Sequence, residues 1–100
     1  KNSIIAGFGS SRSATTLIKF FNIGNKIKYI VDDNESKHNK FTPGSRIQVL
    51  PSEDIYIKKP DYLIIFAWEH TDKIISKHQE FFKNGGAFIR IFPNVEIINK

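Results

Sequence analysis

The stretch SIIAGFGSSRSATTLIKFF, residues 3–21, joins a short apolar run to an amphipathic helix through a glycine-rich turn. Ser3–Ala6 is predicted to be a strand, because it is largely apolar and is followed by Gly7-Phe8-Gly9. Beyond the turn, apolar residues recur at the spacing of one helix face, at Ala14, Leu17, Ile18 and Phe21. A strand, a turn and a helix in this order are typical of a parallel α/β sheet. Gly24 is expected to end the helix.

The rest of the chain repeats this alternation. Strands are predicted at residues 28–31, 47–50, 61–67, 87–92 and 95–98, the last of them at a sheet edge. Residues 52–57 and 74–82 are predicted to be helical, and residues 34–45 form a polar loop. Short connections between alternating strands and helices favour a single Rossmann-like domain over residues 1–100. We expect a three-layer αβα sandwich with a mostly parallel sheet.

Composition limits what such a domain can do. The chain has 100 residues, 40% of them hydrophobic and 25% charged, which fits one ordinary globular domain. No apolar run is long enough to cross a membrane. The absence of cysteine excludes disulfides and thiolate metal sites, and it agrees with a cytoplasmic location, which we expect. The net charge is +5, but the lysines are scattered, so we expect a solvated surface and no nucleic-acid partner. Methionine is also absent, so we expect the chain to be a segment of a longer protein.

Ligands of a parallel sheet bind at the carboxyl ends of its strands. Here those ends carry Gly7–Ser13, Asp32–Asn34, Ala67–His70 and Phe92-Pro93. Gly7 would permit a tight turn, and Gly9 would let the backbone approach a ligand. Asp32 stands where an acid often binds a ribose hydroxyl. The third glycine of a dinucleotide-binding motif is replaced by Arg12, so a plain strand-to-helix turn with a capping aspartate is the alternative.

Hydroxyl side chains crowd the predicted start of the first helix, whereas a helix cap needs only one of them. They belong to Ser10, Ser11, Ser13, Thr15 and Thr16. Backbone N–H groups and the helix dipole favour an anion at this end of a helix. Arg12 would add a bidentate contact to a phosphate. We therefore predict an anion-binding helix start, with plain capping as the alternative.

Trp68-Glu69-His70 follows the most apolar predicted strand and would line the same edge of the sheet. An acid beside an imidazole can transfer protons, but neighbours in sequence do not face each other on a helix, so no dyad is implied. His78 lies on an apolar helix face and is predicted to be packed, and His38 lies in the polar loop. Three dispersed histidines lack the spacing of metal ligands, so no metal site is predicted.

Five stretches keep a distinctive order and spacing over almost the whole chain. They are Gly7–Leu17, Asp32–Lys37, Phe41–Ile47, Pro60–Trp68 and Gly85–Ile89. Together they resemble the C-terminal domain of the sugar-nucleotide C-methyltransferases, and the Thr-Pro-Gly and Pro-Asp…Trp segments are the most specific parts. The chain departs from that pattern at Ser13, where the family usually has lysine, at Glu35, where it has proline, and at Glu69, where asparagine is common.

The resemblance implies a function for the parent enzyme, which would transfer a methyl group from S-adenosylmethionine to a carbon of a 4-keto-deoxysugar on a nucleoside diphosphate. The S-adenosylmethionine-binding domain of the same polypeptide would be the partner of this domain, which would bind no cofactor itself and be inactive alone. Its expected role is to hold the nucleotide sugar, with Gly7, Gly9, Ser10, Ser11, Arg12, Ser13, Asp32, Asn34, Lys37, Trp68, Glu69 and His70. A stand-alone NAD(P)-type dinucleotide-binding module and a structural or interaction domain without ligand are the alternatives.

Overall fold

The computed structural model describes residues 3–10, 12–42, 46–91 and 94–99. Its six-stranded sheet has the order β3-β2-β1-β4-β5-β6, which confirms the predicted Rossmann-like α/β fold. All neighbouring strands pair in parallel except β5 and β6, which are antiparallel, so β6 forms the predicted edge strand. The strands are β1 Ile5–Phe8, β2 Tyr29–Asp32, β3 Val49–Pro51, β4 Tyr62–Ile65, β5 Ala87–Arg90 and β6 Glu96–Ile98.

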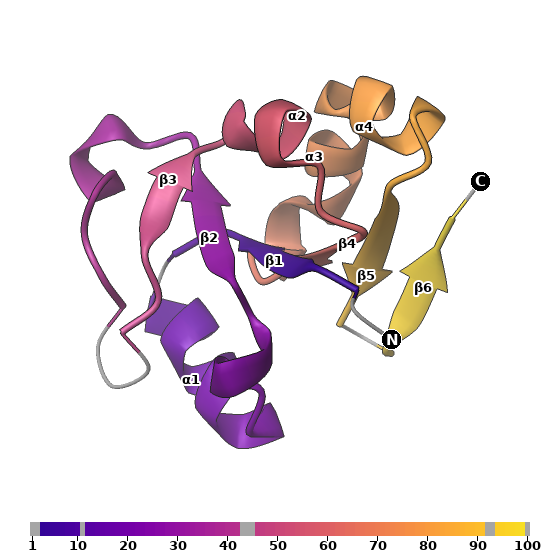
Figure 1. Ribbon diagram of the computed structural model, residues 1–100. Helices are drawn as coiled ribbons and strands as arrows, with labels where there is room; N and C mark the ends of the chain where they lie inside the picture. The colour runs from indigo at the N-terminus through magenta and orange to yellow at the C-terminus, as the bar shows by residue number, and fades with distance from the viewer. Residues whose placement is uncertain (1–2, 11, 43–45, 92–93, 100) are drawn as a thin grey trace.

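Helices cover both faces of this sheet. Figure 1 shows helix α1, Arg12–Phe21, on one face, and α2, Asp54–Lys58, α3, Thr71–Lys77, and α4, Gln79–Lys83, on the other. Two separate clusters of buried side chains follow from this arrangement. The cluster under α1 includes Ala14, Ile18, Ile30, Ile64 and Phe66. The cluster under the other helices includes Phe8, Val31, Ile55, Leu63 and Phe88.

Gly7 lies inside strand β1, and the expected tight turn at this position is therefore wrong. The strand runs to Phe8, because Gly7 and Phe8 pair with Ile30 and Val31 on one side and with β4 on the other. A Cβ atom on Gly7 would lie 2.5 Å from the ring of Phe66, which is fully buried. Gly7 is thus required so that this ring can pack across β1.

Gly9 makes the turn after β1, with a φ of +103° that favours glycine. A Cβ atom here would lie 3.0 Å from the Cβ of Ala67 and 3.1 Å from its backbone nitrogen. The loops that follow β1 and β4 therefore touch each other. Gly9 is needed for this contact between the two loops, so its presence does not by itself indicate a ligand.

Helix α1 ends two residues earlier than predicted. Asn22, not Gly24, adopts the left-handed conformation after the helix, with a φ of 56°. Its N–H donates to the carbonyl of Lys19, and the N–H of Ile23 donates to that of Ile18, which is a Schellman motif. Gly24 instead begins a short 3-10 helix, η1, Gly24–Lys26.

The single helix predicted over residues 74–82 is divided into α3 and α4 at His78. The backbone of His78 leaves the helical region, with φ −115° and ψ 41°. Its ring is buried and its Nδ1 lies 2.8 Å from the hydroxyl oxygen of Tyr56 in α2. Periodicity misses this break, because both halves bury residues on the same side, Ile74 in α3 and Phe81 in α4.

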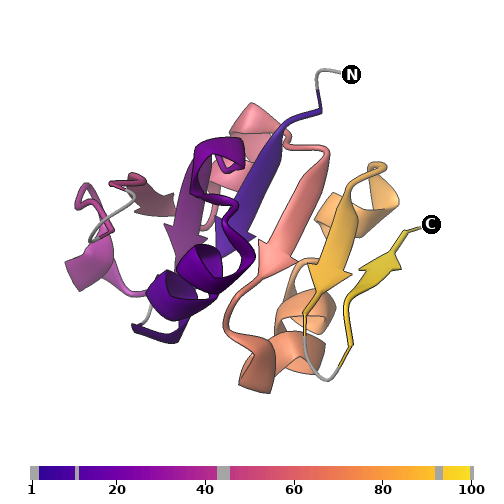
Figure 2. The same cartoon turned by 90° about the horizontal axis from the view of Figure 1, so that it is seen from below.

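The strand order reverses at β1, which lies between β2 and β4. The chain moves from β1 to β2 and β3 in one direction and returns to β4 and β5 on the other side of β1. Figure 2 shows that the parallel strands point the same way. Their carboxyl ends form the edge of the sheet at which α1 begins and at which the chain leaves β4 toward α3. Ligands of open parallel sheets bind at this edge.

Candidate functional site

Asp32, the last residue of β2, joins the loops at the carboxyl edge of the sheet. Its Oδ2 accepts hydrogen bonds of 2.9 Å from the backbone N–H and the hydroxyl of Ser10. Its Oδ1 accepts a 2.9 Å hydrogen bond from the N–H of Asn34. The carboxylate therefore fixes the turn after β1 against the turn after β2, and each of its oxygens already has a donor.

A polar hollow of about 270 Å³ lies beside this junction. We call it the lysine hollow, and its lining residues are Ser10, Ser36, Lys37, Lys40, Phe41, Thr42 and Val49. Two of the predicted site residues, Ser10 and Lys37, thus meet in one place. The lining residues that the structure describes carry two positive charges and no carboxylate, although Asp32 lies behind Ser10.

Local hydrogen bonds shape the wall of the lysine hollow. The 3-10 helix η2, Glu35–Lys37, is capped by Asn34, whose Oδ1 accepts from the N–H of Ser36 at 3.1 Å and from its hydroxyl at 2.9 Å. Nε2 of His38 lies 2.7 Å from the carbonyl oxygen of Asp32. The donors of Ser10 and Ser36 are thus already paired, so an anion in this hollow would be held by the ammonium groups of Lys37 and Lys40.

Phe41 gives the lysine hollow an exposed aromatic side. Its side chain is 61% exposed, although the backbone is fixed by a bridge to Gln48. The adjacent Thr42 is buried, and its hydroxyl oxygen accepts a 2.9 Å hydrogen bond from the N–H of Ile47. An exposed aromatic ring beside two ammonium groups is the combination that can stack on a base while its phosphates are neutralised.

Asp33 ties the other side of the β2 end to the helices. Its carboxylate accepts a hydrogen bond from the hydroxyl of Ser52 and a 3.0 Å ion-pair hydrogen bond from Lys77. Burial would raise the pKa of Asp33, but the donors Ser52 and Lys77 and the Lys77 charge outweigh it and lower that pKa. The two adjacent acids therefore hold different parts of the edge, Asp32 the loops and Asp33 helix α3.

His78 is packed as predicted, 5% exposed, and its ring centroid lies 5.4 Å from that of Phe8. Burial lowers the pKa of His78, and the nearby charge of Asp33 opposes the shift. Its Nε2 is buried without a hydrogen-bond partner in the described part of the chain. The pair of Tyr56 and His78 belongs to the packing between α2 and the α3–α4 junction.

A second hollow, of about 180 Å³, lies after β4 on the other side of the strand-order reversal. We call it the tryptophan hollow, and its lining residues are Trp68, Glu69, His70, Thr71, Asp72, Lys73 and Arg90. Trp68–His70 form the 3-10 helix η3, and the hydroxyl of Thr71 donates to the carbonyl of Trp68 at 2.7 Å. All three residues of the predicted Trp-Glu-His edge are thus brought together here.

The structure brings most of the predicted site residues to one edge, but not into one pocket. Ser10, Asp32, Asn34 and Lys37 gather at or beside the lysine hollow, whereas Trp68, Glu69 and His70 line the tryptophan hollow. Gly7 lies beneath the ring of Phe66 and Gly9 lies against Ala67. Ser11 lies outside the described residues, as do Phe92 and Pro93, and so do the side chains of Arg12 and Ser13.

Nine of the fourteen described residues that line the two hollows were not among the predicted site residues, and the charged or aromatic ones are Lys40, Phe41, Asp72, Lys73 and Arg90. Arg90 had a usable signal, since it is a charged residue at the carboxyl end of a strand. Lys40 and Phe41 lie in a loop whose return toward the sheet is set by the hydrogen bonds of Asn39 and Lys40 with Val49. No local sequence pattern predicts these hydrogen bonds between residues 39–40 and residue 49.

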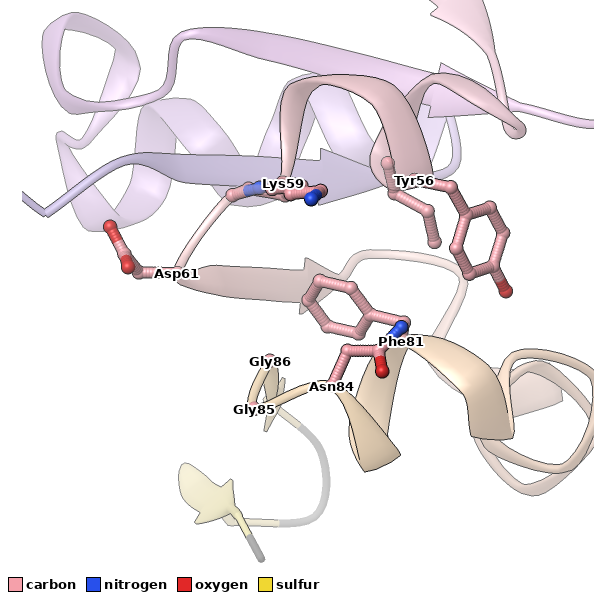
Figure 3. Close-up of a pocket in the computed structure, with 9 residues that line it drawn as sticks. Tyr56, Lys59, Asp61, Phe81, Asn84, Gly85 and Gly86 are labelled. Atoms are coloured by element: carbon pink, nitrogen blue, oxygen red, sulfur yellow. The ribbon is translucent and has the colours of Figure 1, made fainter.

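The largest hollow described, about 580 Å³, lies elsewhere, between α2 and α4 at the amino ends of β4 and β5. Figure 3 shows Phe81 at its centre, with the hydroxyl of Tyr56 and the carboxylate of Asp61 turned away from that ring. Asp61 accepts a 2.7 Å hydrogen bond from the N–H of Ile4, and the hydroxyl of Tyr56 contacts His78. The hollow contains none of the predicted site residues, so we assign the candidate site to the opposite edge.

Two further kinds of site are not found in the described ranges. No group of three or more acidic, histidine or cysteine side chains there could hold a metal ion. None of the helices in those ranges is long and apolar enough to span a bilayer.

Comparison with known proteins identifies the family. The family described as the C-methyltransferase C-terminal domain matches residues 1–93. The C-methyltransferase NovU of Streptomyces niveus is 32% identical over 96 residues, which are 95% of this chain and 23% of that protein. The crystal structure of UDP-D-quinovosamine 4-dehydrogenase from Vibrio fischeri matches with a TM-score of 0.63 over 94% of this chain and 80% of that chain, and its 16% identity speaks for the fold alone. The chain belongs to the family of C-methyltransferase C-terminal domains.

Proposed function

We propose that this domain holds a nucleoside-diphosphate sugar for an S-adenosylmethionine-dependent C-methyltransferase and is inactive by itself. The substrate class is a 4-keto-deoxysugar on a nucleoside diphosphate, and the enzyme acts in the cytoplasm. The relative NovU is named a C-methyltransferase, and this chain corresponds to 23% of its length. We infer, as the family resemblance implies, that methyl transfer takes place in the remaining part of such an enzyme and that this domain contributes substrate binding.

The lysine hollow is the observation that carries the proposal. It lies at the carboxyl ends of β1 and β2, where parallel sheets bind ligands, and Lys37 and Lys40 line it beside the exposed Phe41. Two ammonium groups suit a diphosphate, and an aromatic ring suits the base of a nucleotide. The wall between the hollow and β2 is held by the contacts of Asp32 and Asn34.

S-adenosylmethionine is expected to bind outside this domain, and the charges at the end of β2 support this. A cofactor with a free ribose diol needs an available acid at that position. The carboxylate of Asp32 already accepts three hydrogen bonds, from Ser10 and from Asn34, so only about one of its four acceptor positions is left for a ribose diol. The same contacts argue against the alternative of a stand-alone NAD(P)-binding module, whose third glycine is already replaced by Arg12.

A calorimetric and thermal-shift titration tests the proposal. The domain is titrated with dTDP, UDP, GDP, CDP, NAD and S-adenosylmethionine, and we expect selective binding of one or more nucleoside diphosphates. A ligand at about 100 times its Kd adds about 2.7 kcal/mol of stability, which a domain of this size reports as a clear rise in Tm.

Matched variants locate the site. Replacing both Lys37 and Lys40 with alanine should weaken diphosphate binding by about tenfold and reduce its salt dependence. Lys83→Ala, an exposed lysine in the last turn of α4, should leave the binding unchanged. Binding of NAD alone would favour the dinucleotide module, and no binding of any nucleotide would favour the structural domain.

A further inference from the structure

The tryptophan hollow differs from the lysine hollow in charge. Its lining includes the carboxylates of Glu69 and Asp72 as well as the cations of Lys73 and Arg90. These formal charges cancel, so a diphosphate with its several negative charges gains little here. An uncharged ligand with many hydroxyl groups suits such a lining, because hydroxyls donate to carboxylates and accept from cations.

Arg90 has an unmet hydrogen bond beside the tryptophan hollow. Its Nε–H is buried and has no partner among the residues that the structure describes. The guanidinium makes one weak contact there, an NH2 group 3.5 Å from the carboxylate of Asp72, whose side chain is 97% exposed. A buried donor without an acceptor is unfavourable, so a turn of the Arg90 side chain that brings it to a ligand oxygen is favoured.

The two hollows also lie in a useful arrangement. The lysine hollow reaches β3 through Val49, and the tryptophan hollow reaches β5 through Arg90. Between β2 and β5 lie three strand spacings, or about 14 Å along the edge of the sheet. A nucleotide sugar, which has a base and ribose at one end and a sugar ring at the other, can extend along such an edge.

We propose that the tryptophan hollow binds the sugar ring of the nucleotide sugar, and that Arg90 donates a hydrogen bond to an oxygen of that ring or its substituents. Trp68 supplies the flat apolar surface on which the C–H face of a sugar packs, and Glu69 accepts from hydroxyls. The inference rests on the proposed function, since the diphosphate and base remain in the lysine hollow.

The test compares each diphosphate with its sugar derivative on the same domain. The probe pairs are dTDP and dTDP-glucose, UDP and UDP-glucose, and GDP and GDP-mannose, titrated by calorimetry. For the pair with the preferred base, the sugar nucleotide should bind about tenfold more tightly, the scale of one hydrogen bond to a charged group. Arg90→Lys keeps the charge and loses the Nε–H and the planar fork, so it should abolish this gain and leave diphosphate affinity unchanged.

Two more variants separate a lost contact from a damaged fold. Asp72→Ala removes the acceptor that an NH2 group of Arg90 contacts, so it should increase the gain from the sugar, a change that unfolding cannot produce. Lys83→Gln, a charge control on α4, should change neither affinity. Melting curves of each variant verify that it is folded.

Four outcomes would overturn the inference. If sugar nucleotides bind no more tightly than diphosphates, or if Arg90→Lys retains the gain, the sugar lies elsewhere while the proposed function stands. If Arg90→Lys weakens the diphosphate and its sugar derivative equally, Arg90 holds phosphate instead. If no diphosphate binds at all, the proposed function fails, and the inference fails with it.

Discussion

Replacing Gly7 with alanine should destabilise the domain, although alanine suits a strand better than glycine does. The added Cβ would lie 2.5 and 2.9 Å from two ring atoms of Phe66 and 3.3 Å from Cγ1 of Ile30. Ordinary carbon contacts lie at about 3.5–4.0 Å, so the ring would have to move by about 1 Å. Phe66 is fully buried and has no open space into which it can move freely.

The magnitude follows from two opposing effects. Overpacking a core with one methyl group costs about 2 kcal/mol, within a usual range of about 1–3 kcal/mol. The loss of glycine's freedom in the unfolded chain returns about 0.7 kcal/mol. The expected net loss is about 1.3 kcal/mol, which lowers Tm by about 5–10 °C in a domain of this size.

Urea denaturation and calorimetry of a double-mutant cycle measure this. Phe66→Leu alone should destabilise by leaving a cavity, whereas Phe66→Leu together with Gly7→Ala should be more stable than the sum of the single losses predicts, because the new methyl fills part of that cavity. A Gly7→Ala variant within about 0.5 kcal/mol of the parent, or losses that simply add, would refute the reasoning. The contact with Phe66 would then not be what requires glycine in β1.

Two further predictions concern buried titratable groups. The hydroxyl of Tyr29 is buried without a partner in the described part of the chain, and burial followed by the charge of Asp54 raises its pKa to about 12. Tyr29→Phe should therefore keep or increase Tm at neutral pH. The variant should also remove the loss of stability that we expect as the pH rises from 10 toward 12. A fall in Tm by several degrees at neutral pH would show that the hydroxyl has a partner. Burial lowers the pKa of His78 below 6.5, so the unfolded chain binds the proton more readily and stability should fall as the pH drops below about 6.5. His78→Gln should flatten this acid limb in pH-dependent melts, and an unchanged limb would assign it to other groups such as Asp33.

The mostly parallel sheet between two helical layers could be predicted from the alternation of strands and helices, because the buried strands are continuous apolar runs and α1 has one apolar face. The division of the helix predicted over residues 74–82 into α3 and α4 could not be predicted from periodicity. His78 fits the apolar face equally well in one helix or in two. The division depends on its contact with Tyr56, which lies twenty-two residues earlier in the chain. Contacts between segments distant in sequence leave no local pattern.

The candidate site was predictable as an edge but not as a set of side chains. The rule for parallel sheets places ligands at the ends of β1, β2 and β4, and the two hollows lie there. The same rule cannot tell which polar groups are already paired. From the sequence, the hydroxyl and the backbone N–H of Ser10 could both donate to a phosphate. In the folded chain both donate to Asp32.

The adjacent acids Asp32 and Asp33 show how pairing within the fold changes which residues can recognise a ligand. Each carboxylate holds structure, Asp32 at the loops and Asp33 at Ser52 and Lys77. Once these acids are engaged, the cations among the described lining residues, Lys37 and Lys40 on one side and Lys73 and Arg90 on the other, differ in what they can hold. Lys37 and Lys40 have no carboxylate among the described lining residues of their hollow and suit phosphates, whereas Arg90 shares its hollow with two carboxylates and suits a neutral ring. In the binding mode that we propose, the order of charges along the sheet edge gives the nucleotide sugar a direction, with the sugar on the β4 side.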